Sequence, residues 1–221
     1  NWGRSIGQTA LADVDRDGDL DWIAGNASHA GDVANQICWW EFQAPDRWVR
    51  HELGRGNTDV GGAAFDVDAD GWEDFVAGSR LLLNSREPRS KPFAGVEIGT
   101  IHSHDTEFAD VNGDGRMDLI ANSDQAGLFW FEIPADPRQT WPRHEIASLQ
   151  AHKIHGGVSP KAVADLDGDG DPDVVTGQAW YENLGGTFGP QRVLTIVMDS
   201  AASVYATDLE GDGDADVLAK D

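Results

Sequence analysis

The sequence predicts an all-β protein that is built from repeated four-stranded sheets. Three observations support this fold class. A nine-residue acidic segment recurs five times, each copy runs into a short apolar segment, and the 3.6-residue period of a helix is not sustained along the 221 residues. The copies begin 53, 44, 55 and 43 residues apart. Repeats of roughly 40–50 residues are typical of propellers and solenoids.

The acidic segments follow one rule, with oxygen-bearing side chains at positions 1, 3, 5 and 9 and glycine at position 6. They are Asp13–Asp21, Asp66–Asp74, Asp110–Asp118, Asp165–Asp173 and Asp208–Asp216. Closely spaced carboxylates repel one another, and a bound cation removes this cost. The glycine permits the bend that turns alternate side chains inward. Calcium accepts about 6–8 oxygens in flexible geometry, whereas magnesium requires a tight octahedron, so the pattern predicts up to five Ca²⁺ sites.

Each loop is predicted to bind calcium through the side chains at positions 1, 3, 5 and 9 and through the backbone carbonyl at position 7. The predicted side-chain ligands are Asp13, Asp15, Asp17, Asp21, Asp66, Asp68, Asp70, Asp74, Asp110, Asn112, Asp114, Asp118, Asp165, Asp167, Asp169, Asp173, Asp208, Glu210, Asp212 and Asp216. The predicted carbonyl ligands are Asp19, Trp72, Arg116, Asp171 and Asp214. Because Asn112 is neutral where the other loops have a carboxylate, we expect the third site to be the weakest.

The loops have two alternative interpretations, an EF-hand and a solvated acidic turn. An EF-hand loop has about 12 residues, closes with a bidentate Glu and is followed by a helix. Position 12 here is Ala24, Ala77, Ala121, Thr176 or Ala219, and apolar, partly β-branched segments follow the loops. A solvated acidic turn explains a single copy, since Asp-Gly is common in turns. Five copies in register favour metal binding over both alternatives.

Each repeat contains segments for up to four strands. Small-residue strands precede the loops, at Gln8–Ala12, Gly61–Phe65, Thr106–Ala109, Lys161–Ala164 and Val204–Thr207. Apolar second strands follow them, at Trp22–Gly25, Phe75–Gly78, Leu119–Asn122, Val174–Gly177 and Val217–Lys220. Third strands, mostly aromatic, are expected at Cys38–Glu41, Arg80–Asn84, Leu128–Glu132 and Ala179–Asn183. Fourth strands that open on an aromatic residue are expected at Trp48–Leu53, Phe93–Ile98, Trp141–Ile146 and Phe188–Val193. Four antiparallel strands per unit correspond to one blade of a β-propeller.

With its five DxDxDGxxD-like loops, its WYEN segment (Trp180–Asn183) and its WVRHEL and WPRHEI segments, the chain resembles the FG-GAP or VCBS repeat family of calcium-binding β-propellers, relatives of the integrin α-chain head. The resemblance covers essentially the whole chain. It implies calcium loops between the first two strands of each blade. It does not imply one function, because the family includes adhesion modules, lectin-like domains and domains attached to enzymes.

The ends of the sequence bear on the number of blades. The fifth unit has only its first two strands, and Trp2–Ile6 resembles Trp48–Leu53 with one residue fewer. A five-bladed propeller spanning residues 1–221, with the last blade completed by this N-terminal strand, is therefore predicted. The alternative is a portion of a larger propeller. The absence of an initial Met or a signal-like segment is expected of a processed or trimmed piece.

Charge and composition limit the partners and the location. The formal net charge is −23, and 23 of the 39 acidic residues lie inside the loops. This acidity argues against nucleic acid as a partner, and no apolar stretch is long enough for a transmembrane helix. Weak calcium sites fill reliably where calcium is millimolar, so an extracellular, periplasmic or cell-surface location is expected. Cys38 is the single cysteine and forms no intrachain disulfide.

The sequence leaves two functions open. The first is a calcium-stabilised binding or adhesion module for a glycan or a protein surface. The second is a lyase-like catalytic or accessory domain of a polysaccharide-degrading enzyme, with His104 and His155 as candidate catalytic residues. Their sequence neighbours His102, Asp105 and His152 also precede acidic loops, but no further catalytic motif supports an enzyme. Tryptophans at one recurring strand position, Trp39, Trp130 and Trp180, are expected to pack between blades, and a sugar-stacking platform is the minor alternative.

Overall fold

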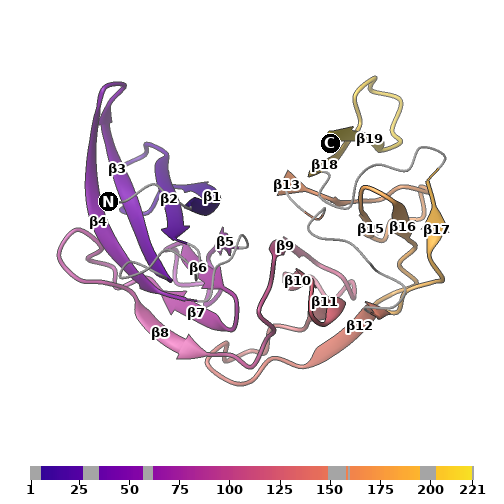
Figure 1. The fold of residues 1–221 in the computed structure, drawn as a ribbon, viewed down its shortest axis with the longest axis horizontal. Helices are drawn as coiled ribbons and strands as arrows, with labels where there is room; N and C mark the ends of the chain where they lie inside the picture. Colours follow the sequence, from indigo (N-terminus) through magenta and orange to yellow (C-terminus); the bar gives the residue numbers. More distant parts are fainter. Residues whose placement is uncertain are drawn as a thin grey trace. The chain divides into compact units, whose positions relative to one another are not determined.

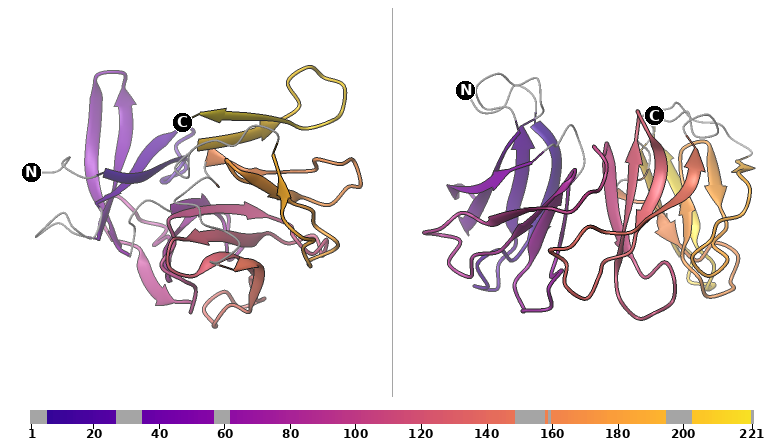
Figure 2. Two further views of the ribbon diagram at one scale, coloured as in Figure 1. Left: turned by 45° about the vertical axis from the view of Figure 1, so that its right-hand side comes forward. Right: turned by 90° about the horizontal axis from the view of Figure 1, so that it is seen from below.

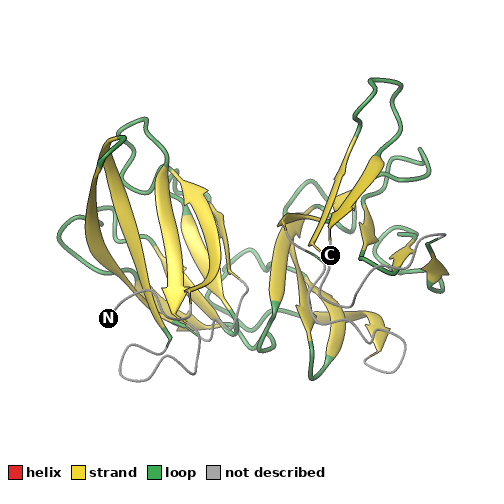
Figure 3. Cartoon of the chain, turned by 45° about the horizontal axis from the view of Figure 1, so that its top comes forward, coloured by secondary structure: helices red, strands yellow, loops and turns green. Residues whose placement is uncertain are grey.

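The computed structural model describes residues 6–26, 35–56, 62–148, 158, 160–194 and 203–220. All regular secondary structure in these residues is β-strand (Figure 3), so the all-β prediction is confirmed. The chain divides into two compact units. The first contains residues 1–103 and 134–141, and the second contains residues 104–133 and 142–221.

Four of the five repeats form a four-stranded antiparallel sheet whose strands are adjacent in chain order, as predicted for a blade (Figure 1). The sheets are β1 (Ile6–Ala12), β2 (Asp21–Asn26), β3 (Gln36–Ala44), β4 (Arg47–Arg55); β5 (Gly62–Phe65), β6 (Asp74–Ala77), β7 (Arg80–Leu83), β8 (Ala94–Glu97); β9 (Asp105–Ala109), β10 (Asp118–Ser123), β11 (Gly127–Phe131), β12 (Arg143–Ser148); and β14 (Val163–Ala164), β15 (Asp173–Val175), β16 (Ala179–Tyr181), β17 (Arg192–Val193). In both views of Figure 2 the strands of the first sheet lie side by side.

The fifth repeat forms a smaller sheet. Its antiparallel strands β18 (Ser203–Thr207) and β19 (Asp216–Lys220) are joined by the fifth acidic loop, and the short β13 (Pro160–Lys161) pairs with β18 in parallel. The predicted N-terminal strand is tested only at its last residue. Ile6 pairs with Asn26 and belongs to β1, whereas residues 2–5 lie outside the described part of the chain.

The fourth strands begin later than predicted in three repeats, by one residue at β8 and by more at β12 and β17. Pro142 lacks a backbone N–H, and β12 starts only after it, at Arg143. Trp141 itself is 2% exposed, and its indole N–H donates to the carbonyl of Pro137 at 2.9 Å. In the fourth repeat Pro190 separates Phe188 from β17, so Phe188 forms only a single bridge with Asn183.

The predicted first strand of the fourth repeat is split at Ala162. The N–H of Ala162 donates to the carboxylate of Glu107 in β9 at 2.7 Å, and its carbonyl accepts the N–H of Val175 at 2.8 Å. Residues 160–161 consequently pair with β18, whereas residues 163–164 pair with β15. Burial raises the pKa of Glu107 to about 8, although Ala162 and Lys161 act in the opposite direction.

We expect Glu107 to make the protein less stable as the pH rises from about 4.5 to about 8. Its carboxyl group is protonated more readily in the folded state than in the unfolded state, so this contribution is complete at low pH and is lost through that window. Glu107→Gln keeps an acceptor for Ala162 but cannot ionise. Thermal melts between pH 5 and pH 8 should therefore fall less steeply for Glu107→Gln than for the wild type or for the exposed control Glu145→Gln. Equal slopes for all three proteins would contradict the assignment.

Each unit has its own apolar core between neighbouring sheets. In the first unit Trp39 packs in one cluster with Phe75 and Leu82 of the second sheet. In the second unit Trp130 packs with Val174 and Tyr181 of the fourth sheet. Trp39 and Trp130 are 0% and 3% exposed, and Trp180 is partly buried against the second cluster, which confirms their predicted packing role.

Candidate metal centre

The five acidic loops share one backbone conformation. In every loop the N–H of the position-6 glycine donates to the position-1 aspartate, over 2.8–3.1 Å. These glycines, Gly18, Gly71, Gly115, Gly170 and Gly213, all have φ between +83° and +102°. A side chain is strained in this region, so the predicted need for glycine at the bend is confirmed.

The position-9 aspartates tie each loop to its sheet. Asp21, Asp74, Asp118 and Asp173 are at most 2% exposed. One carboxylate oxygen accepts the N–H of position 2, and the other accepts an N–H near the end of the third strand or just after it. Burial raises the pKa of Asp74 to about 7 and those of the other three to about 6. A carboxylate has about four lone-pair sites, so these groups retain capacity for a cation.

Three loops bring carboxylates together closely enough for one ion. The groups are Asp13, Asp15 and Asp17 in the first loop, Asp66, Asp68 and Asp70 in the second, and Asp165, Asp167 and Asp173 in the fourth. Within each group the potential ligand atoms all lie within 4.8 Å of one another. Among the described residues, neither the third nor the fifth loop forms such a group.

The donor set fits a hard cation. Oδ1 of Asp15 and Oδ1 of Asp68 are buried and have no hydrogen-bond partner. A buried carboxylate oxygen without a donor is costly, and a cation in the same cluster would satisfy it. The loop itself holds the position-5 carboxylate in place, because its Oδ1 accepts the N–H of position 7 in every loop. Ligation by the carbonyls of Asp19, Trp72, Arg116, Asp171 and Asp214 remains a prediction.

Arginines lie on several loops, which the sequence pattern did not indicate. Arg89 contacts Asp15 and Asp17 in the first loop, and Arg138 and Arg86 contact Asp68 and Asp70 in the second. In the third loop Arg116 pairs with Asp114 at 2.7 Å. Most of these arginines come from other segments of the chain, so no local motif reveals the pairs.

A second recurring arrangement joins the third and fourth strands. His51 stacks on Trp39 with ring centroids 4.5 Å apart, and its Nε2 lies 2.9 Å from Glu41. His144 stacks in the same way on Trp130, at 4.0 Å. In the fourth sheet a cation–π contact replaces the ring stacking, with Arg192 4.6 Å from the Trp180 ring centroid. The matching positions of His51 and His144 in the sequence are thus explained by sheet packing.

Two buried asparagines connect neighbouring repeats within each unit. The Asn84 side-chain amide donates to the carbonyl of Val14, in the preceding acidic loop, at 3.0 Å. Asn183 makes the equivalent bond to the carbonyl of Val111 at 2.7 Å. The corresponding residues of the first and third repeats are Phe42 and Ile133. The sequence has asparagine at this position in every second repeat, but the carbonyls that the asparagines bind lie far away along the chain.

The candidate catalytic histidines are only partly placed. Nδ1 of His104 lies 3.3 Å from Asp105, and Asp105 also accepts the N–H of Val158 at 3.3 Å. The contact with Asp105 holds the backbone of Val158 next to β9. His152 and His155 lie outside the described residues, so a catalytic role for His104 and His155 remains a prediction.

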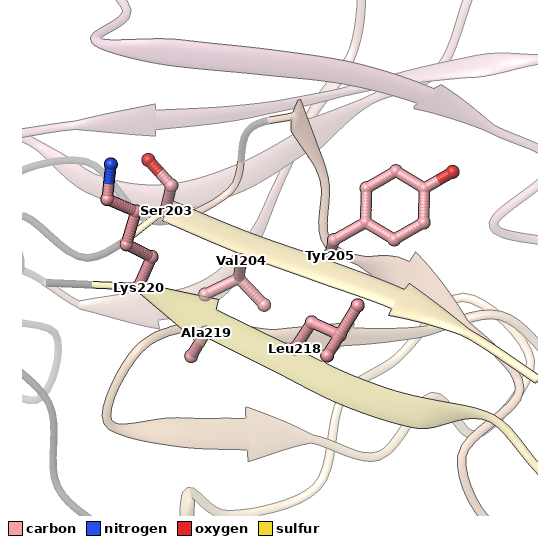
Figure 4. Close-up of a pocket in the computed structure, with 6 residues that line it drawn as sticks. All are labelled: Ser203, Val204, Tyr205, Leu218, Ala219 and Lys220. Carbon is pink, nitrogen blue, oxygen red and sulfur yellow. The ribbon is translucent and has the colours of Figure 1, made fainter. Parts of the chain in front are cut away.

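A shallow pocket lies on β18 and β19 (Figure 4). It is lined by Ser203, Val204, Tyr205, Leu218, Ala219 and Lys220. Leu218 is 49% exposed, whereas the residues at the same repeat position, Ile23, Val76, Ile120 and Val175, are at most 2% exposed. Among the described residues no further sheet covers this face, and no residue of the acidic loop lines the pocket.

The carboxylate clusters allow the loops to be ranked experimentally. Asp165 and Asp110 each accept two loop N–H groups, so their replacement by Ala removes similar hydrogen bonds. Only Asp165 belongs to a three-carboxylate cluster. In calcium we expect Asp165→Ala to lower stability and calcium uptake more than Asp110→Ala does, and in chelator we expect similar losses. Calorimetry of both variants tests this. A larger calcium-dependent loss for Asp110→Ala would mean that charge does not order the sites.

Sheets of this type with acidic loops between their first two strands define an all-β repeat protein. Residues 110–176 and 165–219 match the family model of the FG-GAP-like repeat. This part of the chain therefore consists of FG-GAP-like repeats, and the resemblance to that family is confirmed. No curated protein matches the sequence. In the described residues, no helix is long and apolar enough to cross a membrane.

Two solved structures show a similar fold. An Agrocybe aegerita lectin, described as recognising non-reducing terminal N-acetylglucosamine, matches with a TM-score of 0.63 and 19% identity over 99% of this chain. The V. cholerae biofilm matrix protein Bap1 matches with a TM-score of 0.53 and 17% identity over 97% of this chain. The chain spans 61% of the lectin chain and 34% of the Bap1 chain. At these identities the likeness concerns the fold alone.

Proposed function

We propose that the chain is a calcium-stabilised module that binds glycans or a protein surface outside the cell. The observation that supports calcium most directly is the first loop. It places three carboxylates within 4.8 Å of one another, and one buried oxygen, Oδ1 of Asp15, has no hydrogen-bond donor. Bound Ca²⁺ would supply positive charge that offsets the carboxylate repulsion. The side chains at positions 1, 3, 5 and 9 would hold it.

The binding function is supported by the fold comparison. Both similar structures belong to proteins whose descriptions concern recognition or a matrix: a lectin specific for terminal N-acetylglucosamine and a biofilm matrix protein. A biofilm matrix lies outside the cell, where millimolar calcium would fill weak loops, and this supports the same location for the module. A glycan is the ligand class to test first.

We also propose that the five repeats are blades of one five-bladed propeller spanning residues 1–221. The four sequential four-stranded sheets and the similarity over nearly the whole chain support this architecture. The segment before β1 would complete the fifth blade. A larger propeller is the alternative, and a crystal structure of the protein distinguishes the two by its number of blades.

A glycan array probed with calcium-loaded protein tests the binding function. We expect calcium-dependent binding to a restricted set of glycans, and arrays with terminal N-acetylglucosamine provide the first comparison. A parallel assay for unsaturated uronic acid products tests the lyase-like alternative. Product formation without retention on any glycan would overturn the proposal in favour of an enzyme. No binding to glycans or to matrix proteins would also overturn it.

A further inference from the structure

Arg89 brings a positive charge to the first acidic loop. Its Nη2 lies 2.7 Å from Oδ2 of Asp15, 2.8 Å from Oδ2 of Asp17 and 3.0 Å from Oε1 of Glu41. A single guanidinium group therefore contacts the carboxylates at positions 3 and 5 together with one from the third strand. Charge-assisted contacts of this kind are stronger than neutral hydrogen bonds.

Asp15 shows which side of the cluster Arg89 occupies. Its side chain is 2% exposed, and its ion pair with Arg89 is made at Oδ2. Oδ1 is buried without a donor. The arginine thus neutralises part of the loop charge while one ligand atom remains unpaired for a metal.

The fold presents Arg89 through an ordered turn between β7 and β8. The N–H groups of Ser90 and Lys91 both donate to the carbonyl of Glu87 at 2.9 Å, and Lys91 pairs with the Glu87 carboxylate at 2.8 Å. The hydroxyl of Ser85 closes the turn by donating to the carbonyl of Lys91 at 3.0 Å. These contacts hold the backbone turn that carries Arg89 in one conformation.

The loops differ in how far arginines neutralise their carboxylates. In the second loop, arginines contact Oδ2 of Asp68 at 3.2 Å and Oδ2 of Asp70 at 2.7 Å. The cluster of Asp165, Asp167 and Asp173 has no ion pair with any residue that the structure describes. The fourth loop therefore has the same need for a cation, and none of the described arginines or lysines meets it.

We propose that Arg89 is a built-in counter-ion of the first loop, which keeps the loop folded when calcium is scarce and lowers its calcium affinity. The inference rests on the proposed calcium function. The positive charge of Arg89 reduces carboxylate repulsion in the metal-free protein, and the same charge repels an incoming Ca²⁺. Arginine and calcium thus stabilise the same carboxylates, and each weakens the effect of the other.

The test compares melting temperatures in chelator and in millimolar calcium for the wild type, Arg89→Gln, Arg89→Lys and the exposed control Arg47→Gln. We expect Arg89→Gln to lower the melting temperature mainly in chelator, so that its calcium-induced increase exceeds that of the wild type by roughly 2–4 °C. Arg89→Lys should remain close to the wild type because it keeps the charge. Arg47→Gln should leave the increase unchanged.

Three outcomes would overturn the inference. An equal loss for Arg89→Gln in both conditions would show a structural contact only, and a smaller calcium-induced increase would show that Arg89 assists the metal. A wild type without any calcium-induced increase would overturn the calcium function and this inference together. In the first two cases the wild type keeps its calcium-induced increase, so the inference alone is overturned.

Discussion

Removal of calcium is expected to lower the melting temperature by roughly 10 °C or more. A ligand that binds only the folded state at about 100 times its Kd adds about 2.7 kcal/mol per site. For a chain of this size, 1 kcal/mol corresponds to about 2–4 °C, so two filled loops account for the shift. The three loops with clustered carboxylates are the sites that should contribute. Calorimetric scans before and after exhaustive EGTA treatment provide the measurement.

The chelation experiment has an internal control. Adding calcium back in excess of EGTA should restore the original melt, whereas adding magnesium should restore little, because magnesium keeps its own waters and requires an octahedral site. An unchanged melting temperature after chelation would overturn the calcium proposal. Equal recovery with both ions would mean that charge alone, and not calcium coordination, stabilises the loops.

Replacement of Asn183 by Ala is expected to cost ~3 kcal/mol or more of unfolding free energy. The side chain is 0% exposed and makes three hydrogen bonds to backbone: it donates to the carbonyls of Val111 and Pro172, and it accepts the N–H of Gly186. Each buried group left without a partner costs about 1–3 kcal/mol.

Urea unfolding measures the loss of stability in Asn183→Ala. Thr187→Ala, an exposed change in the same turn, is the matched control and should cost little. Similar losses for the two variants would contradict a connecting role for Asn183.

Much of the fold was predictable because each repeat contains its own local signals. The DxDxDGxxD pattern fixes a loop whose glycine has positive φ, and the apolar residues on either side form strands in the predicted order. Strand ends were less predictable. Pro142 delays β12, and Glu107 interrupts the segment at Ala162 by accepting its N–H. The second effect depends on a residue 55 positions away.

The candidate metal centre was predicted in part. Loop spacing correctly places Asp13, Asp15 and Asp17 in one cluster. It also places Asp173 with Asp165 and Asp167, but it does not reveal that Asp169 and the position-9 residues of the first two loops stay outside the clusters. Nor does it reveal Arg89, because that arginine lies 72 residues after Asp17. Contacts set by the packing of one sheet on the next have no short-range pattern in the sequence.

The buried asparagines indicate which parts of the chain unfold together. Asn84 and Asn183 occur in the second and fourth repeats, and each reaches the loop of the repeat before it. The repeat spacing alternates in the same way, as 53, 44, 55 and 43 residues. The pair of repeats is thus the smallest unit that contains both an asparagine and its valine carbonyl. Fragments cut between pairs should accordingly exchange amide hydrogens more slowly than fragments cut within one. The reverse order would refute the pair as the unit that unfolds together.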